Sequence, residues 1–179
     1  MKRLHWIRVS VMLSLFAACQ TPPTIDVERS EQLDVLSSLE IKNASVPESG
    51  LLCAGQLTEE QFDALALIGY RNFINLRLRN EVGTGWEEKH AGTIGVTFER
   101  LPIANSNSIS EENAQELARL LDAADSPVVL YCGSSNRVGA LYGAKAFYVD
   151  GATPDQAMDL ANRAGMTRLE PRLKELLEN

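Results

Sequence analysis

Short apolar runs alternate along the chain with longer stretches in which apolar residues recur every third or fourth position. The short runs have the length of buried strands, and the stretches between them have the spacing of amphipathic helices. Strands are expected at 51–54, 73–76, 96–103 and 128–131, and helices at 58–68, 86–91, 111–124, 140–148, 154–164 and near the carboxyl terminus. This alternation predicts a three-layer α/β/α domain with a mainly parallel sheet of four or five strands.

Polar residues at the expected helix starts support these boundaries. Thr58 with Gln61 and Thr153 with Gln156 have the spacing of capping boxes, in which two side chains satisfy free amides at a helix amino terminus. Ser108 with Glu111 has the same spacing, which assigns Glu111 a role in helix capping.

The stretch from Ser126 to Gly143 carries the main candidate chemistry. Cys132 directly follows the apolar run 128–131, and ligands bind at the carboxyl ends of parallel strands. The small residues after Cys132 allow backbone amides to surround an anion, which also favours a thiolate with a pKa below the usual value of about 8.5. Arg137 adds a planar guanidinium suited to an oxyanion. This pattern indicates a nucleophilic cysteine in an anion-binding loop; the alternative is a buried structural cysteine before a helix.

Three segments resemble one known group of enzymes. Ala54-Gly55-Gln56 with Thr58, the run Phe73–Arg77 with Glu81, and the loop from Cys132 to Arg137 resemble the protein tyrosine phosphatase-like group of cysteine phosphatases. The match is to the small bacterial dual-specificity-type domain that also occurs in beta-lactamase hydrolase-like proteins, and it covers about 120 residues, from Gly50 to roughly Thr167.

The resemblance implies roles for individual residues. Cys132 would be the nucleophile and Arg137 would bind phosphate, with no metal and no organic cofactor. The remaining phosphate contacts would come from the loop residues and from one arginine after the second strand, namely Gly133, Ser134, Ser135, Asn136 and Arg77. The ligand would be a phosphorylated small molecule or protein.

The sequence also departs from the phosphatase pattern. Four residues separate Cys132 from Arg137, where the common signature has five, and Tyr131 and Val138 replace the usual His and Ser or Thr. A loop of this length is similar to that of rhodanese sulfurtransferases. The segment Ala104–Ser110, where such phosphatases supply an acidic residue, contains no carboxylate. Three functions therefore remain: a phosphatase, a rhodanese-like sulfurtransferase, and an anion-binding module with little or no turnover.

Several charged residues near these segments have two interpretations each. Either Glu111 or Glu112 could replace the missing acid. Arg77 could be a second anion contact or a solvated charge at a strand end. Glu81 could hold Arg77 or Arg137, although contact with water is favoured. His90 is expected to be a surface residue, because no other histidine or cysteine has metal-ligand spacing to it.

The amino-terminal residues have the pattern of a bacterial lipoprotein signal. Lys2, Arg3 and Arg8 precede a short apolar run at 9–18, and the segment up to Cys19 resembles a lipoprotein processing box. We expect a signal peptide at 1–18, a tether at 19–49 and the phosphatase-like domain at 50–179. A lipid on Cys19 would anchor the protein in the bacterial cell envelope, and Gln20 favours the periplasmic face of the outer membrane. Plain secretory cleavage after Ala17 or Ala18 is the alternative.

Composition limits the partners. The apolar fraction of 45% and charged fraction of 23% are ordinary for a soluble domain. Loss of residues 1–18 removes three basic and no acidic residues, so the net charge changes from −7 to −10. Such a chain is unsuited to nucleic acid, and its expected membrane contact is the lipid. Cys53 and Cys132 could form a disulfide or remain separate thiols.

Overall fold

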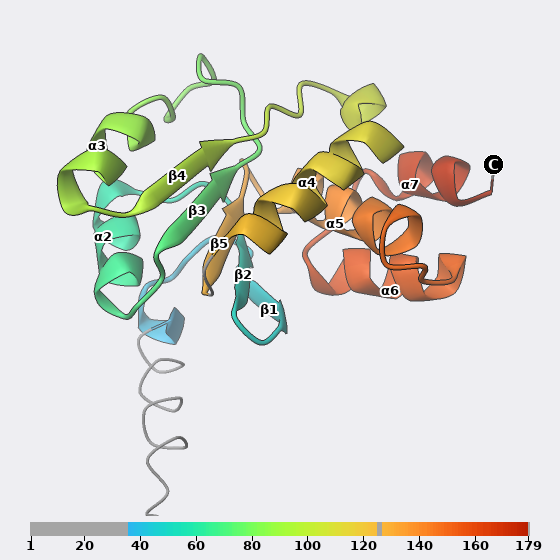
Figure 1. The fold of residues 1–179 in the computed structure, drawn as a ribbon, viewed down its shortest axis with the longest axis horizontal. Coiled ribbons are helices and arrows are strands. Elements are labelled where there is room, and N and C mark those ends of the chain that lie inside the picture. Colours follow the sequence, from blue (N-terminus) through green and yellow to red (C-terminus); the bar gives the residue numbers. More distant parts are fainter. Residues whose placement is uncertain (1–35, 125–126, 179) are drawn as a thin grey trace, which may run out of the picture.

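The computed structural model describes residues 36–124 and 127–178, which fold around one five-stranded sheet. The spatial order of the strands is β1-β2-β5-β3-β4 (Figure 1). Their bounds are β1 Ser45–Glu48, β2 Leu51–Ala54, β3 Asn72–Asn75, β4 Thr97–Arg100 and β5 Val128–Tyr131. Strands β2, β5, β3 and β4 are parallel, and only the edge pair β1–β2 is antiparallel. The predicted, mainly parallel sheet is therefore confirmed.

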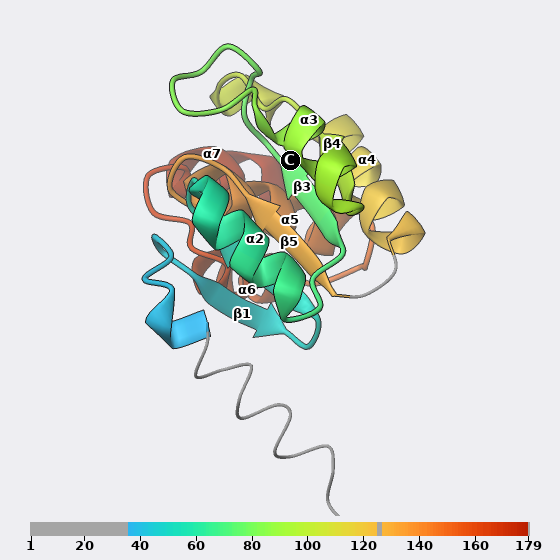
Figure 2. The ribbon, with the colours of Figure 1, turned by 90° about the vertical axis from the view of Figure 1, so that its left-hand side faces the viewer.

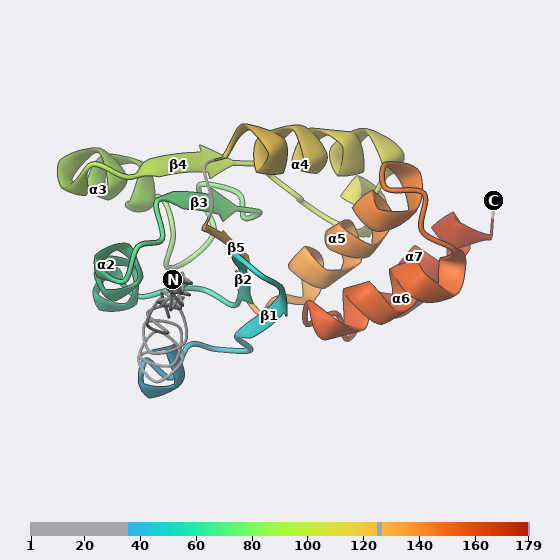
Figure 3. The same cartoon turned by 60° about the horizontal axis from the view of Figure 1, so that its bottom comes forward.

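Side chains alternate between two cores along each central strand. Leu52, Phe73 and Val129 belong to a core that includes Phe62 of α2 and Ala91 of α3. The intervening residues pack into a second core formed with α4 to α7. Figure 2 shows α2 in front of the sheet with α5 to α7 behind it, and Figure 3 shows the sheet between the two groups of helices. These layers confirm the predicted α/β/α arrangement.

Helices occur where apolar spacing predicted them. Their bounds are α2 Glu59–Leu67, α3 Glu87–Ile94, η1 Ser106–Ser108, α4 Glu111–Ala123, α5 Asn136–Tyr148, α6 Pro154–Arg163 and α7 Glu170–Leu177, where η1 is a 3-10 helix. Both capping boxes predicted for α2 and α6 are present.

The cap predicted for α4 is wrong. Ser110, not Ser108, caps this helix, since its hydroxyl accepts a hydrogen bond from the amide of Asn113. Ser108 instead lies in η1, two residues earlier. Glu111 is therefore the first residue of α4, and it does not form the predicted capping box with Ser108.

The domain begins earlier than predicted. Ser45–Glu48, which the sequence interpretation placed in the tether at 19–49, forms β1 and pairs with β2. Ile41 is buried in the core under α2. The boundary predicted at residue 50 falls instead within the turn between β1 and β2. The predicted signal peptide at 1–18, Cys19 and most of the predicted tether lie outside the described residues.

Two glycines bring α5 and α6 into close contact. A Cβ atom at Gly143 would lie 2.7 Å from the Cβ of Ala161 and 2.8 Å from the carbonyl oxygen of Ala157. A Cβ at Gly139 would overlap the backbone amide of Met166. Small residues at these positions therefore let α6 pack directly behind the helix that follows Cys132. None of the described helices is both long and apolar enough to cross a lipid bilayer.

Candidate active site

Cys132 lies at the carboxyl end of the central strand. Its amide donates to the carbonyl of Ala54 over 3.1 Å, and the amide of Leu76 donates to the carbonyl of Tyr131 over 2.9 Å. The ends of β2, β5 and β3 are thereby aligned, and Cys132 is 1% exposed. Parallel alignment thus brings together the three segments on which the sequence resemblance rests.

Cys53 on the neighbouring strand is also buried, and both thiols are free. The alternative of a disulfide between Cys53 and Cys132 is therefore not realised in this structure. Burial raises the pKa of the Cys53 thiol, and the nearby Glu48 and Cys132 raise it further. Cys53 is consequently held as a neutral thiol at ordinary pH.

The loop after Cys132 is attached to three other segments. Ser135 has a left-handed backbone conformation (φ 60°), and its hydroxyl donates to the carbonyl of Ala164 over 2.8 Å. Ser134 forms a bridge with Gly55, and its carbonyl accepts a hydrogen bond of 3.0 Å from the side chain of Asn43. These contacts fix a tight backbone turn at the start of α5, which suits a loop that must present amides to an anion.

Asn136 has a structural role for its side chain. Its Oδ1 accepts hydrogen bonds from the amides of Thr167, Arg168 and Leu169 at 2.8, 2.7 and 3.2 Å, and from the hydroxyl of Thr167 at 3.1 Å. The side chain therefore connects the first turn of α5 to the segment between α6 and α7. The predicted contact of Asn136 with phosphate stays a prediction.

Glu81 holds Arg137 in a bidentate ion pair. Its two carboxylate oxygens accept from Nη1 and Nη2 of Arg137 at 2.7 and 2.8 Å, and Nη1 also donates to the carbonyl of Ile103 at 2.9 Å. Glu81 also accepts from Nε of Arg77 at 2.9 Å. The expectation that Glu81 faces water is therefore wrong. The hydrogen bond from Arg137 is the largest cause that lowers the pKa of Glu81, to about 2.

We expect this ion pair to stay formed through the neutral and mildly acidic range. The pKa of Glu81 falls from its ordinary value of 4.5 to about 2 on folding, so its contribution to stability is complete above about pH 4.5 and disappears as the pH falls toward 2. Thermal unfolding of the protein and of Glu81→Gln at pH 2.5, 4 and 6 measures how much the ionised Glu81 contributes to stability at each pH. The difference in melting temperature should shrink on acidification; a difference that is constant over this range would contradict it.

Arg77 adjoins the loop, and each of its three side-chain nitrogens already donates a hydrogen bond within the protein. Besides Glu81, it donates from Nη1 to Oε1 of Gln56 at 2.6 Å and from Nη2 to the carbonyl of Val82 at 2.9 Å. A Cβ at Gly133 would lie 4.0 Å from its Nε. The geometry thus shows Arg77 supporting Glu81 beside the loop, and its predicted contact with an anion stays a prediction.

A buried carboxylate organises the segments beneath the site. Glu87 of α3 is fully buried and accepts from Asn75 and Thr84, at 3.0 and 2.7 Å, and from Nη2 of Arg100 at 3.1 Å. Its further partners are the amide of Gly85 and the side chains of Gln56 and Tyr131. Burial opposes the charge, but these hydrogen bonds outweigh it and the pKa of Glu87 is lowered. Glu87 is not identifiable from the sequence, because nothing in its helix marks it as buried.

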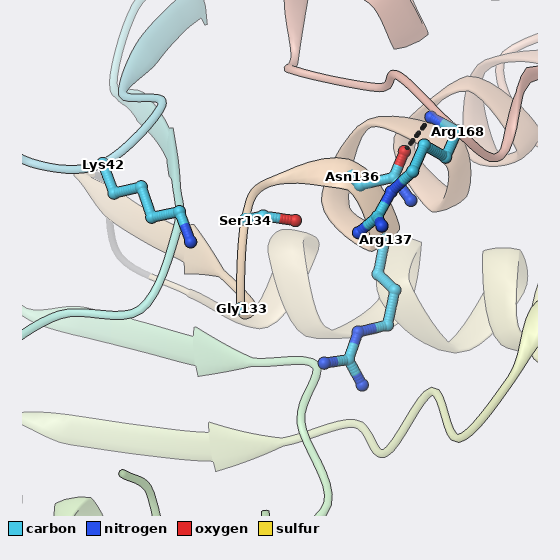
Figure 4. A pocket seen from close by; sticks show the side chains of 6 residues that line it. All are labelled: Lys42, Gly133, Ser134, Asn136, Arg137 and Arg168. Atoms are coloured by element: carbon cyan, nitrogen blue, oxygen red, sulfur yellow. Dashed lines mark hydrogen bonds between the residues drawn. The ribbon is translucent and has the colours of Figure 1, made fainter. Parts of the chain in front are cut away.

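A cavity of about 300 Å³ lies against the loop (Figure 4). It is lined by the loop, the start of α5 and two cations from other segments, namely Gly133, Ser134, Asn136, Arg137, Lys42 and Arg168. No carboxylate is among these lining residues. Lys42 and Arg168 were not identified from the sequence; Lys42 fell in the predicted tether, and Arg168 comes from a turn far along the chain.

The other predicted candidates lie away from this cavity. Glu111 and Glu112 are exposed at the start of α4, and Glu111 accepts from the side chain of Gln115. His90 is partly buried and contacts Asp63 at 2.6 Å and Glu59 at 3.3 Å, so it links α3 to α2 and is less exposed than expected. The described residues contain no cluster of three or more metal-ligating side chains.

Solved structures share the fold of this chain. A candidate phosphatase of Neisseria meningitidis superposes with a TM-score of 0.60 at 23% identity, over 74% of this chain and 96% of that one. The phosphatase Tk-PTP gives a TM-score of 0.61 at 21% identity, over 76% of this chain and 97% of its own. TpbA of P. aeruginosa gives 0.60 at 15% identity, over 76% and 84%.

The chain has the protein tyrosine phosphatase-like fold. No protein-family model matches it. A beta-lactamase hydrolase-like protein of Xylella fastidiosa is 30% identical over 96 residues, which cover 51% of this chain and 22% of that protein. The matched region thus spans about a fifth of the length of this distant relative. The solved structures are less than 25% identical to this chain, so the similarity to them shows the fold alone.

Proposed function

We propose that this domain hydrolyses phosphomonoesters through a phosphocysteine on Cys132. One observation carries the proposal: the central strand of a phosphatase-like sheet ends in a buried cysteine, and a constrained turn leads to an arginine that a carboxylate holds beside it. Strand, turn and helix amino terminus together form the arrangement that binds oxyanions in α/β proteins.

The reaction has two steps. In the first, the Cys132 thiolate attacks phosphorus, the phosphorus–oxygen ester bond breaks, and the leaving oxygen takes a proton from water. In the second, water attacks phosphorus, the sulfur–phosphorus bond breaks, and phosphate leaves with the thiolate restored. Loop amides and the Arg137 guanidinium would stabilise the negative charge on the nonbridging oxygens.

The lining of the cavity sets the expected substrate reactivity. With no carboxylate at the cavity, proton donation to the leaving oxygen lacks a general acid, whose help typically supplies 10²–10⁴-fold. Aryl phosphates with weakly basic leaving groups, such as 4-nitrophenyl phosphate, depend least on this help and are therefore the appropriate assay substrates. Among phosphatase-fold proteins, a TpbA variant has been crystallised with phosphotyrosine and PTPMT1 with PI(5)P.

Arg137→Lys tests the role of the guanidinium. A lysine keeps the positive charge but loses the planar fork of donors, so we expect the rate on 4-nitrophenyl phosphate to fall by about 10²–10³-fold. Arg119→Lys is the matched control, because Arg119 also pairs with a glutamate, Glu116, but on the exposed surface of α4. An equal loss in both variants, or no loss in Arg137→Lys, would refute this role.

A second candidate function is anion binding with little turnover. The absence of a carboxylate at the cavity favours it, since binding needs the cations and amides alone. It predicts that the protein binds inorganic phosphate and that the rate on 4-nitrophenyl phosphate equals that of Cys132→Ser. The rhodanese-like alternative rests on the length of the loop and on the absence of a carboxylate in the segment Ala104–Ser110.

We also propose that a lipid on Cys19 anchors the protein in the bacterial envelope, at the periplasmic face of the outer membrane. The support is the processing box at 15–19 and the residue after it. Mass spectrometry of the protein purified from bacterial membranes tests this proposal: the amino-terminal peptide should begin at a lipidated Cys19. An unmodified amino terminus would contradict it.

A further inference from the structure

Two cations at the cavity have no part in the proposed hydrolysis. Lys42 and Arg168 line it together with the loop, and in Figure 4 they lie on opposite sides of Ser134. Within residues 36–124 and 127–178, neither side chain forms an ion pair. Exposed cations are usually solvated, but here two converge on one concave surface of a chain whose net charge is −7.

The loop supplies only part of the positive charge at the cavity. Arg77 and Arg137 share the one carboxylate of Glu81, so these three groups carry a net charge of about one positive unit. That charge and the loop amides suit the transferable phosphate. Lys42 and Arg168 add two further positive charges at the rim of the same cavity, outside the loop, where they can pair with a second anionic group of the same ligand.

Both rim cations project from backbone that is fixed against the loop. The carbonyl of Lys42 accepts the amide of Gly55 at 2.7 Å, and the adjacent Asn43 binds Ser134. The amide of Arg168 donates to Asn136 at 2.7 Å. Because the backbone is already ordered on both sides, ligand binding would need to order only the side-chain ends.

We infer that the cavity takes a small phosphomonoester that carries a second anionic group, a phosphate or a carboxylate, bound by Lys42 and Arg168. The inference rests on the proposed function, because Arg137 and the loop amides hold the transferable phosphate. A cavity of about 300 Å³ is at the small end of ligand pockets, which favours a small molecule over a protein segment.

A pair of matched ligands tests this specificity. 3-Carboxyphenyl phosphate and 3-carbamoylphenyl phosphate have nearly the same shape and differ by one negative charge. Calorimetric titration of Cys132→Ser protein at low ionic strength measures their binding without turnover. We expect 3-carboxyphenyl phosphate to bind about fivefold more tightly than 3-carbamoylphenyl phosphate, since one exposed ion pair contributes up to about 1 kcal/mol, which is about a fivefold change in affinity.

Charge-removing variants identify the cations responsible. In the Cys132→Ser background, Lys42→Gln and Arg168→Gln should each reduce the preference, and together they should abolish it. Lys174→Gln removes one charge from an exposed site on α7, away from the cavity, and should leave the preference unchanged. Melting temperatures of all variants should agree within a few degrees, because these side chains are exposed.

Several outcomes would overturn the inference. These are equal affinity for the two ligands, a preference that survives the double variant, and tighter binding of a phosphotyrosine peptide with no other charged group than of either ligand. The proposed function is tested separately, by measuring whether the protein with Cys132 intact releases phosphate from these ligands. A binding preference without any hydrolysis would support the second anion site and refute the hydrolase.

Discussion

Cys132→Ser is expected to reduce hydrolysis of 4-nitrophenyl phosphate to the rate of the buffer. Removing a catalytic nucleophile typically costs about 10⁴–10⁶-fold, because the covalent route is lost and only binding remains. The serine hydroxyl is nearly isosteric with the thiol, so the loop and its contacts with Asn43, Gly55 and Ala164 should persist. Initial rates between pH 5 and 8, measured on protein of unchanged melting temperature, give the result.

Cys53→Ser is the matched control for this experiment. Cys53 is a free thiol, is buried and lies on the strand next to β5, so the same chemical change is made within the same core. It should lower the stability somewhat, because a hydroxyl is introduced among apolar side chains, but it should leave most of the activity. Activity that survives in Cys132→Ser, or that is lost equally in both variants, would refute a phosphocysteine on Cys132.

Glu87→Ala is expected to have the largest effect on stability. The substitution leaves Nη2 of Arg100 and the side chains of Asn75 and Gln56 without their buried partner. Removing one member of a buried charged network typically costs about 3–5 kcal/mol, since the remaining charge and polar groups keep their desolvation penalty. Urea denaturation, with the slope against urea compared between proteins, measures the loss in free energy of unfolding.

Glu88→Ala provides the comparison within the same helix. Glu88 also pairs with Arg100, from Oε1 to Nε at 2.8 Å, but its side chain is 33% exposed. Water can replace most of that interaction, so the expected loss is about 1 kcal/mol or less. Similar losses in the two variants would show that burial of Glu87 does not govern the stability of the network.

The elements of the fold that were predictable have strong local signals. The run 128–131 is apolar over its whole length, and β5 has these bounds; the boxes at Thr58 and Thr153 are satisfied within four residues of sequence. Even local signals can compete, however. Ser108 and Ser110 both precede α4. Ser108 has a glutamate three residues later, as a capping box requires, whereas Ser110, the observed cap, is followed at that position by Asn113.

The parts of the site that were not predictable depend on distant segments. Cys132 and Arg137 were marked by their own loop, whereas Glu81 meets Arg137 across 56 positions of sequence and was expected to contact water. Lys42 and Arg168 reach the cavity from opposite ends of the domain, so no spacing between neighbours could mark them. Such contacts depend on the order of the strands in the sheet, and this order cannot be inferred from the spacing of residues along the sequence.

The attachment of the segment at 41–43 to the loop also determines how the domain can be isolated. A fragment that begins at residue 50 would expose the open edge of β2 in place of β1, and exposed strand edges promote aggregation. A fragment that begins at Ser45 would keep the edge but lose Lys42, together with the hydrogen bond from Asn43 to the loop. Biochemical work on this domain therefore requires a fragment that includes Ile41, and one that begins at Leu36 also keeps Leu36 and Leu39, which pack against the core.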